Sequence, residues 1–438
     1  MSRDFAIIHG KTPRGILPVN SNNFHNKPCF ITYTEQEIFM SEQNITELLH
    51  PAFLARMKEM LGEEYDSFIK SYKVPRTYGL RVNTAKISCE EFEKLVPYTP
   101  GEQPQDKKYI KLNTNESPFP PSDKAVSGVS DIFKRLMLYP DPECTGLNEK
   151  FAKLIGVEKD EVMAVNGSDE ILNFAFSAFC DKEKTAVFPD ITYGFYEVFA
   201  DYNGAPYKKI PLGDDFKINI SDYFNANATV FIANPNAPTG IALTLDDVEE
   251  IVKNNPDNVV VIDEAYVDFG GESAVPLIHK YGNLLVTQTF SKSRSAAGAR
   301  LGFGIACKSL IADLNTVRFS TNPYNINAMT MALGEGILDD EDYTRKNCKK
   351  IIEARLFAEN ELKKLGFEMT NSSANFIFAR HKNISGEKIY KKLKEKGILV
   401  RHFNGERIKD FNRITVGTKD EMTVLIGKLK EIIKEEFK

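Results

Sequence analysis

One lysine stands where a strand is expected to end. Lys292 follows the apolar, β-prone run NLLVTQTF (283–290) and precedes SRSAAGAR (293–300), which is rich in small residues and arginine. A lysine desolvated at a sheet edge and near other cations loses its proton more readily than a free amine. A neutral amine of this kind can form a Schiff base with an aldehyde. Lys292 is therefore a candidate catalytic residue, against the ordinary alternative of a solvated turn residue.

Groups suited to hold a phosphate occur at another expected strand end and after the lysine. Gly167 and Ser168 follow the run EVMAV (161–165) at a strand-to-helix turn, with Asp169 in the first helical turn. Free N–H groups at a helix start and a serine hydroxyl bind phosphate well, although such a serine alone is often only an N-cap. Arg300 adds a planar cation suited to phosphate.

Three more expected strand ends carry groups that suit a flat, cationic ring. Asp263 ends NVVVID (258–263); such a carboxylate often caps a turn, but beside a cationic heterocycle it would keep a ring nitrogen protonated. Tyr193 could stack on the ring, and NPNAPTG (234–240) is a turn-forming loop rich in Asn and Pro. Together with the lysine and the phosphate-binding groups, these residues specify a phosphorylated aldehyde held as a Schiff base, namely pyridoxal phosphate.

The elements that would position these residues follow an α/β pattern. The expected strands are 161–165, 185–189, 229–234, 258–265 and 283–290, separated by helical segments. Their nearly continuous Val, Ile and Phe content predicts a mainly parallel central sheet with flanking helices on both faces. Open sheets of this type bind ligands at the carboxyl ends of their strands, where the candidate residues lie.

The remaining segments suggest further domains. A long charged helix at 340–364 precedes short strands and helices, which predicts a smaller α+β domain. Near the N-terminus the spacing of apolar residues predicts a helical extension from about residue 45, then a turn and a second helical stretch at 87–96. The expected division is an N-terminal extension at 1–97, a large domain at 140–335, and a small domain formed by 98–139 with 336–438.

Composition excludes several classes of protein. A formal net charge of −5 in 438 residues gives no basic field for nucleic acid, so the charge argues against a nucleic-acid partner. The six cysteines form no C-x-x-C pair, which favours reduced thiols in the cytoplasm over disulfides or a zinc site. No apolar run is long enough to cross a membrane, and no histidine spacing suggests a metal.

From about residue 98 onward, the sequence resembles the histidinol-phosphate aminotransferase family, whose members have fold type I and use pyridoxal phosphate. The resemblance is carried, in family order, by the motifs LNTNESPFPPS, YPDP, NGSDE, NPNAPTG, VIDEAY, TFSK and RITVGT. It implies a homodimer with shared active sites that moves an amino group between L-histidinol phosphate and 2-oxoglutarate in histidine biosynthesis. No metal is implied.

The resemblance also implies roles for individual residues. Lys292 would form the Schiff base and act as general base, Asp263 would pair with the ring nitrogen, and Tyr266 would bind the ring hydroxyl O3′. The residues implied in cofactor binding are Gly167, Ser168, Asp169, Tyr193, Asn236, Asp263, Tyr266, Thr289, Ser291, Lys292 and Arg300, with Tyr139 contributed by the neighbouring subunit. The residues implied in substrate binding are Tyr98, Asn115, Arg401 for a phosphate and Arg413 for a carboxylate.

Two features depart from the family pattern: the loop at 234–240, and the segment after the lysine, which reads SRSAAGARLG where SKAFGLAGLRVG is commoner. Ala237 stands in NPNAPTG where the family usually has an asparagine that contacts O3′, so Asn236, a water or Tyr266 alone would hold that oxygen. Residues 45–97 instead resemble the N-terminal segment of bacterial cytosine-C5 RNA methyltransferases, but no methyltransferase domain follows them. Because a fold does not fix its chemistry, an aromatic amino acid aminotransferase or a threonine-phosphate decarboxylase on the same scaffold is an alternative, which Arg401 and the entrance residues decide. A non-enzymatic RNA-binding adaptor built on residues 45–97 is the other alternative, and the acidic charge disfavours it.

Overall fold

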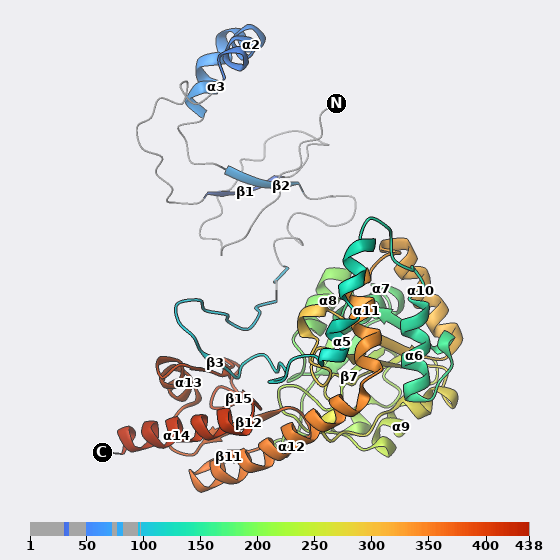
Figure 1. Ribbon diagram of the computed structural model, residues 1–438, viewed down its shortest axis with the longest axis vertical. Coiled ribbons are helices and arrows are strands. Elements are labelled where there is room, and N and C mark those ends of the chain that lie inside the picture. Colours follow the sequence, from blue (N-terminus) through green and yellow to red (C-terminus); the bar gives the residue numbers. More distant parts are fainter. Residues whose placement is uncertain (1–29, 35–49, 72–76, 82–94, 97, 438) are drawn as a thin grey trace. The chain divides into compact units, whose positions relative to one another are not determined.

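The computed structural model describes residues 30–34, 50–71, 77–81, 95–96 and 98–437. The chain divides into two compact units, Met1–Val96 and Pro97–Lys438, each of which is described by itself (Figure 1). The candidate residues all belong to the second unit.

The described residues of the first unit include two short α-helices and a pair of strands. Helix α2 (Pro51–Leu61) begins after His50, whose ring Nδ1 accepts the Ala52 N–H at 3.2 Å, and α3 (Tyr65–Ser71) follows it. Strands β1 (Phe30–Thr34) and β2 (Thr77–Arg81) pair antiparallel. Residues 30–34 form a strand that the sequence does not predict, and residues 77–81 form a strand where a turn is expected, because pairing between distant segments leaves no local pattern. The expected helix at 87–96 falls almost wholly outside the described residues.

A seven-stranded sheet is the centre of the second unit. Its strand order is β4-β10-β9-β8-β7-β5-β6, and β10 runs antiparallel to both of its neighbours while the other pairs are parallel. The strands are β4 (Val162–Val165), β5 (Ala186–Pro189), β6 (Tyr207–Ile210), β7 (Thr229–Ala233), β8 (Val260–Asp263), β9 (Leu284–Thr289) and β10 (Gly302–Ala306). The five expected strands and the mainly parallel sheet are confirmed. The other two strands, β6 and β10, are not expected from the sequence, because their segments, YKKI and GFGIA, lack the long apolar run of the others.

Helices cover both faces of this sheet. Along β4, Val162 and Ala164 join one buried cluster with residues of α6, α9 and α11, while Met163 and Val165 join a second cluster with residues of α7, α8 and α10. Because successive side chains of a strand point to opposite faces, the two clusters are the two faces of the sheet. The helices are α5 (Asp123–Ser127), α6 (Thr145–Ile155), α7 (Ser168–Phe179), α8 (Phe195–Asn203), α9 (Leu245–Lys253), α10 (Lys308–Thr321) and α11 (Ala328–Leu338).

A smaller α+β region completes the unit, as expected from the sequence. Its antiparallel sheet has the order β11-β12-β15-β14, and β13 pairs in parallel with β3. The long helix α12 leads from the helices of the large sheet to this region, where it packs beside α14 (Figure 1). The elements are β3 (Ile110–Lys111), α12 (Glu341–Lys364), β11 (Phe367–Met369), β12 (Phe376–His381), α13 (Gly386–Glu395), β13 (Ile398–Leu399), β14 (Arg401–His402), β15 (Asn412–Thr415) and α14 (Lys419–Glu436).

Candidate active site

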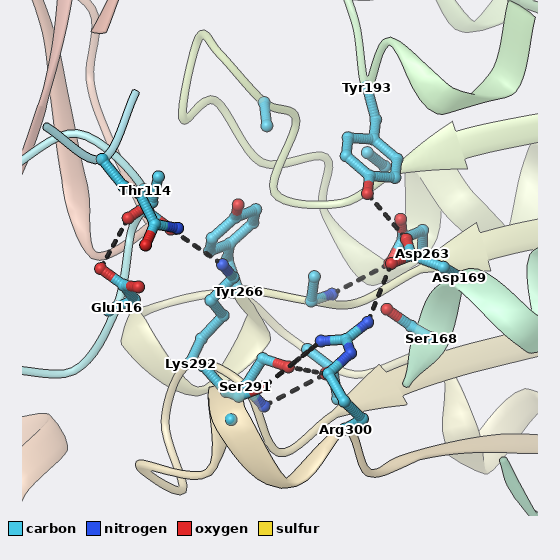
Figure 2. A pocket seen from close by; sticks show the side chains of 17 residues that line it. Thr114, Glu116, Ser168, Asp169, Tyr193, Asp263, Tyr266, Ser291, Lys292 and Arg300 are labelled. Atoms are coloured by element: carbon cyan, nitrogen blue, oxygen red, sulfur yellow. Dashed lines mark hydrogen bonds and ion pairs between the residues drawn. The ribbon is translucent and has the colours of Figure 1, made fainter. Parts of the chain in front are cut away.

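A cavity of about 380 Å³ opens at the carboxyl ends of the parallel strands. Residues that follow β4, β7, β8 and β9 form most of its wall, and residues 103–116 close the remaining side. Figure 2 shows Lys292 and Tyr266 between two groups, with Thr114 and Glu116 on one side and Asp169, Ser168 and Arg300 on the other. The structure therefore brings residues from distant parts of the chain into one site.

Lys292 reaches into the cavity from the loop after β9. Its Nζ donates a hydrogen bond to the carbonyl oxygen of Thr114 at 3.1 Å and lies 6.0 Å from the centre of the Tyr266 ring. Burial lowers the pKa of this amine to about 8, and the positive charge of Arg413 acts in the same direction. A sizeable fraction of the amine is thus neutral near physiological pH, as a nucleophile or a general base requires.

Asp263 is the last residue of β8 and is 4% exposed. Its Oδ1 accepts hydrogen bonds from the Thr287 hydroxyl and the Ala265 N–H, both at 3.2 Å, and its Oδ2 accepts one from the Tyr196 hydroxyl at 3.2 Å. Burial raises the pKa of Asp263 to about 6, against the lowering effect of Thr287. The cavity thus holds a carboxylate that a cationic partner would stabilise.

The phosphate-binding groups expected from sequence lie together at the start of α7. Gly167 caps this helix at φ +78°, and a Cβ on it would stand 2.6 Å from Nη2 of Arg300. The Arg300 guanidinium donates to Asp169 Oδ2 at 3.1 Å and to Ser291 Oγ at 3.4 Å. A helix N-terminus, hydroxyl groups and a guanidinium therefore face the same end of the cavity, as an anion site requires. Ser168 and Thr289 also line this cavity.

Two tyrosines hold positions on the wall through their hydroxyl groups. Tyr193 donates to Asp169 Oδ1 at 2.7 Å, which ties its ring to the start of α7. The hydroxyl of Tyr266 accepts from Asn115 Nδ2 at 2.9 Å. Asn115, 1% exposed, does not line the cavity itself and acts as the support of Tyr266.

The two candidate substrate arginines project from neighbouring strands of the small sheet. Arg413 on β15 donates through Nη2 to the carbonyl of Asn113 at 3.2 Å, and its buried Nε has no hydrogen-bond partner in the described part of the chain. Arg401 on β14 donates to the carbonyl oxygens of Thr99 and Pro100 at 3.2 and 3.3 Å. Neither guanidinium group forms an ion pair with an acidic residue in the described part of the chain, so both remain available to an anion.

Besides Gly167, Asn115, Arg401 and Arg413, three more of the predicted site residues do not line the cavity. The buried amide of Asn236 is used within its loop: Nδ2 donates to Ile191 O and Thr239 Oγ1, and Oδ1 accepts from Thr192. Tyr98 stacks on Phe195 with ring centres 4.2 Å apart, and Tyr139 is 81% exposed and stacks on Tyr324. Ala237, in contrast, is part of the wall.

Sequence reasoning missed three polar wall residues and one residue behind the wall. Gln103, Thr114 and Glu116 line the cavity, and Glu116 accepts hydrogen bonds from Lys111 Nζ and Thr114 Oγ1, both at 2.6 Å. These residues precede the first strand of the large sheet, so they do not lie at the strand ends where ligand-binding residues are expected. The motif LNTNESP, which contains Thr114 and Glu116, is the sequence feature that could have identified those two. Tyr196, which supports Asp263, has no signal beyond being one aromatic residue of an amphipathic helix.

Comparisons with known proteins agree with this geometry. Residues 107–429 match the family described as aminotransferase class I and II, and residues 49–109 match the N-terminal domain of 16S rRNA methyltransferase RsmF. The histidinol-phosphate aminotransferase of Brachyspira hyodysenteriae is 49% identical over 347 residues, which cover 79% of this chain and 98% of that protein. That of Clostridium beijerinckii is 45% identical over 355 residues, or 81% and 99% of the two chains.

Solved structures show the same fold. A putative histidinol-phosphate aminotransferase from Erwinia carotovora superposes with a TM-score of 0.70 at 26% identity, covering 75% of this chain and 97% of that one. The histidinol-phosphate aminotransferase from Sinorhizobium meliloti, solved in complex with pyridoxal-5′-phosphate, has a TM-score of 0.70 at 22% identity and covers 75% and 92%. The uncovered part of this chain corresponds in length to its first unit.

Proposed function

Since this chain belongs to the class I and II aminotransferases, and within them to the histidinol-phosphate aminotransferases, we propose that it transfers an amino group between L-histidinol phosphate and 2-oxoglutarate. Histidine biosynthesis is the pathway that this reaction serves. One observation carries the proposal: a partly neutral lysine, a buried carboxylate and an anion site face the same cavity.

The residues present fit pyridoxal phosphate. Gly167 leaves room at the start of α7, beside Arg300, that a Cβ would fill. This cradle would hold the phosphate together with Ser168 and Ser291. Asp263 would hold the ring nitrogen, and Lys292 lines the same cavity. When bound, this cofactor supplies an aldehyde that condenses with amines and a protonated ring that accepts electron density from the substrate.

The residues of the chain then have separable tasks. Lys292 Nζ moves the proton at the substrate Cα, and the Thr114 carbonyl keeps that amine inside the cavity. Asp263 holds a proton on the ring nitrogen. The Tyr266 oxygen already accepts a hydrogen bond from Asn115, so its own proton is directed elsewhere and can be donated to the ring hydroxyl, a task for which Ala237 has no polar group.

Arg413 and Arg401 would bind the anionic groups of the substrates. We propose Arg413 for the carboxylate of glutamate and 2-oxoglutarate, and Arg401 for the phosphate of histidinol phosphate, since neither has an acidic partner among the described residues. Tyr98, on the segment that Arg401 holds, would lie at the entrance. Initial rates with histidinol phosphate, tyrosine and phenylalanine as amino donors test the proposal: histidinol phosphate should have the highest kcat/KM, and a preference for phenylalanine would refute this substrate.

A variant at Arg401 separates the substrate assignment from the fold. Arg401→Ala should raise the KM for histidinol phosphate by tenfold or more, roughly the effect of losing one charge-assisted contact, and should change phenylalanine turnover little. Arg380→Ala is the control, because Arg380 is a partly exposed arginine of the same sheet that pairs with Glu368. Equal losses on both donors would favour the aromatic aminotransferase instead.

We further propose a cytoplasmic homodimer whose sites are shared. Tyr139, in its YPDP motif, is 81% exposed and does not line the cavity of its own chain, as expected of a residue that completes the site of a second subunit. The four cysteines that fall in the described residues, Cys144, Cys180, Cys307 and Cys348, are all free thiols, which suits a reducing compartment. No helix of the described residues has the length and apolarity to cross a membrane.

A further inference from the structure

Tyr196 is a fully buried tyrosine that lies behind the cavity without lining it. It is the second residue of α8, and its ring packs edge-on against Tyr193 and tilted against Phe188 and Phe231. Its hydroxyl donates to Asp263 Oδ2 at 3.2 Å. A buried hydroxyl in an aromatic cluster is costly unless it is hydrogen-bonded, so this contact sets where the Tyr196 ring tip lies.

The hydrogen bonds of Asp263 are divided unequally between its two oxygens. Oδ1 receives two donors, the hydroxyl of Thr287 and the N–H of Ala265, whereas Oδ2 receives only the hydroxyl of Tyr196 from the described residues. Each carboxylate oxygen can accept about two hydrogen bonds. The vacant acceptor position of this cavity-lining carboxylate is therefore on Oδ2, beside the proton that Tyr196 donates.

We propose that Tyr196 is a positioning residue for the reaction: it orients Asp263 and keeps it ionised, so that Oδ2 holds the protonated ring nitrogen of the cofactor. This inference rests on the proposed function and adds to it a residue that contacts neither cofactor nor substrate. The proposed role depends on the hydroxyl group and not on the ring, because a phenylalanine ring would fill the same space without donating a hydrogen bond to Asp263.

The electrostatics of the site give the hydroxyl its importance. Burial raises the pKa of Asp263, and the negative charge of Asp169 on α7 raises it further. The hydroxyl groups of Thr287 on β9 and Tyr196 on α8, and the N–H of Ala265, act against these effects. Without the Tyr196 hydroxyl, Oδ2 loses its one donor from the described residues, and Asp263 becomes easier to neutralise.

Tyr196→Phe tests the proposal, with Tyr223→Phe as a matched control. Tyr223 is also buried in this unit, at 1% exposed, but its hydroxyl has no hydrogen-bond partner among the described residues. Two properties of each purified holoenzyme are measured. The first is the pH midpoint of the visible absorption change of the bound cofactor. The second is the dissociation constant of pyridoxal phosphate and of its analogue with carbon in place of the ring nitrogen.

Tyr196→Phe should raise the dissociation constant of pyridoxal phosphate roughly tenfold, as removal of a group that supports a ligand-binding residue commonly does, but should leave that of the carbon analogue unchanged. The pH midpoint should move upward by about half a unit or more, because a less firmly protonated ring withdraws less electron density and the chromophore keeps its proton to higher pH. Tyr223→Phe should match the wild type in both properties.

The outcomes separate this inference from the proposed function. Equal losses with both cofactors, or a midpoint equal to that of the wild type, would show a merely structural role and overturn the inference. In the Asp263→Asn background Tyr196→Phe should have no further effect on cofactor binding, and an undiminished effect there would overturn it as well. A wild-type chain that fails to bind pyridoxal phosphate at all would instead refute the proposed function.

Discussion

The amine of Lys292 and the carbonyl oxygen of Thr114, 178 positions apart in the chain, are joined by a hydrogen bond of 3.1 Å. Lys292 follows a strand of the large sheet, whereas Thr114 follows β3, which pairs with β13 of the smaller region. The contact therefore holds the reactive amine across the cavity that the two regions enclose. It also places the amine where water is scarce, which lowers its pKa.

Replacing Lys292 by alanine should abolish amino transfer while leaving cofactor binding largely intact. The loss in kcat should be roughly 10⁴-fold or more, because the nucleophile and the general base disappear together. The groups around Gly167 and Arg300 that would hold the phosphate remain. Single-turnover assays and equilibrium dialysis with pyridoxal phosphate measure the two effects. Lys280→Ala, at an exposed lysine paired with Glu249, is the control; wild-type rates in the Lys292 variant would remove the mechanism.

The cofactor-free chain should combine with pyridoxal phosphate faster as the pH rises through 8, with a plateau above about pH 9. Only the neutral amine attacks an aldehyde, and the pKa of Lys292 is about 8 instead of its ordinary 10.5. The neutral fraction of Lys292 therefore rises through pH 8 and is nearly complete above pH 9. Stopped-flow absorbance after mixing gives the rates. A rate that keeps increasing up to pH 10.5 would show that the amine is not desolvated.

Replacing Asp263 by asparagine should stabilise the cofactor-free chain at pH 7 and abolish efficient turnover. The folded-state pKa of Asp263, about 6, lies above its ordinary value of 3.8, so ionised Asp263 destabilises the fold. This cost is absent below pH 3.8, grows between pH 3.8 and 6, and is complete above pH 6. Denaturant unfolding at pH 7 should show a gain of about 1–3 kcal/mol. The same comparison at pH 4 should show almost none, and a gain independent of pH would refute the assignment.

An alanine at Gly167 should weaken cofactor binding selectively. Its φ of +78° strains any residue with a side chain, and the added Cβ would push against Arg300. Gly156 has the same φ but open space around it. Gly156→Ala, in the left-handed helical region, should cost about 1 kcal/mol in stability, and Gly167→Ala, whose ψ of 158° puts it in a region open almost only to glycine, about 1–3 kcal/mol. Only Gly167→Ala should raise the dissociation constant of pyridoxal phosphate, by about tenfold. Equal affinities in the two variants would show that the cradle does not hold the phosphate.

Mixing two inactive variants should restore activity if subunits share their sites. Tyr139→Ala removes a residue proposed to act in the partner subunit, and Lys292→Ala removes one that acts in its own. A mixed dimer keeps one site with both residues intact, so the activity of the mixture should exceed that of either variant alone after subunit exchange. Lys292→Ala mixed with itself is the control. A mixture that stays inactive although exchange is shown by mass spectrometry would refute shared sites.

The sequence by itself determined the sheet and the residue types at its strand ends. Strands such as β8, VVID, are apolar on both faces because helices cover both, and this pattern is visible without the fold. The same rule that ligands bind at carboxyl ends put Lys292, Asp263 and Gly167 in one site, where the structure has them.

Only the tertiary structure decided which residues support those groups. Thr114, Asn115 and Tyr196 reach the site through hydrogen bonds to residues 67 to 178 positions away, and no local period reports such contacts. The structure likewise turned the amide of Asn236 into its own loop, and it paired β1 with β2 across segments without a strand pattern. Local propensity and periodicity record which face of an element is buried, whereas the partner of a polar group depends on long-range packing, which is a property of the whole fold.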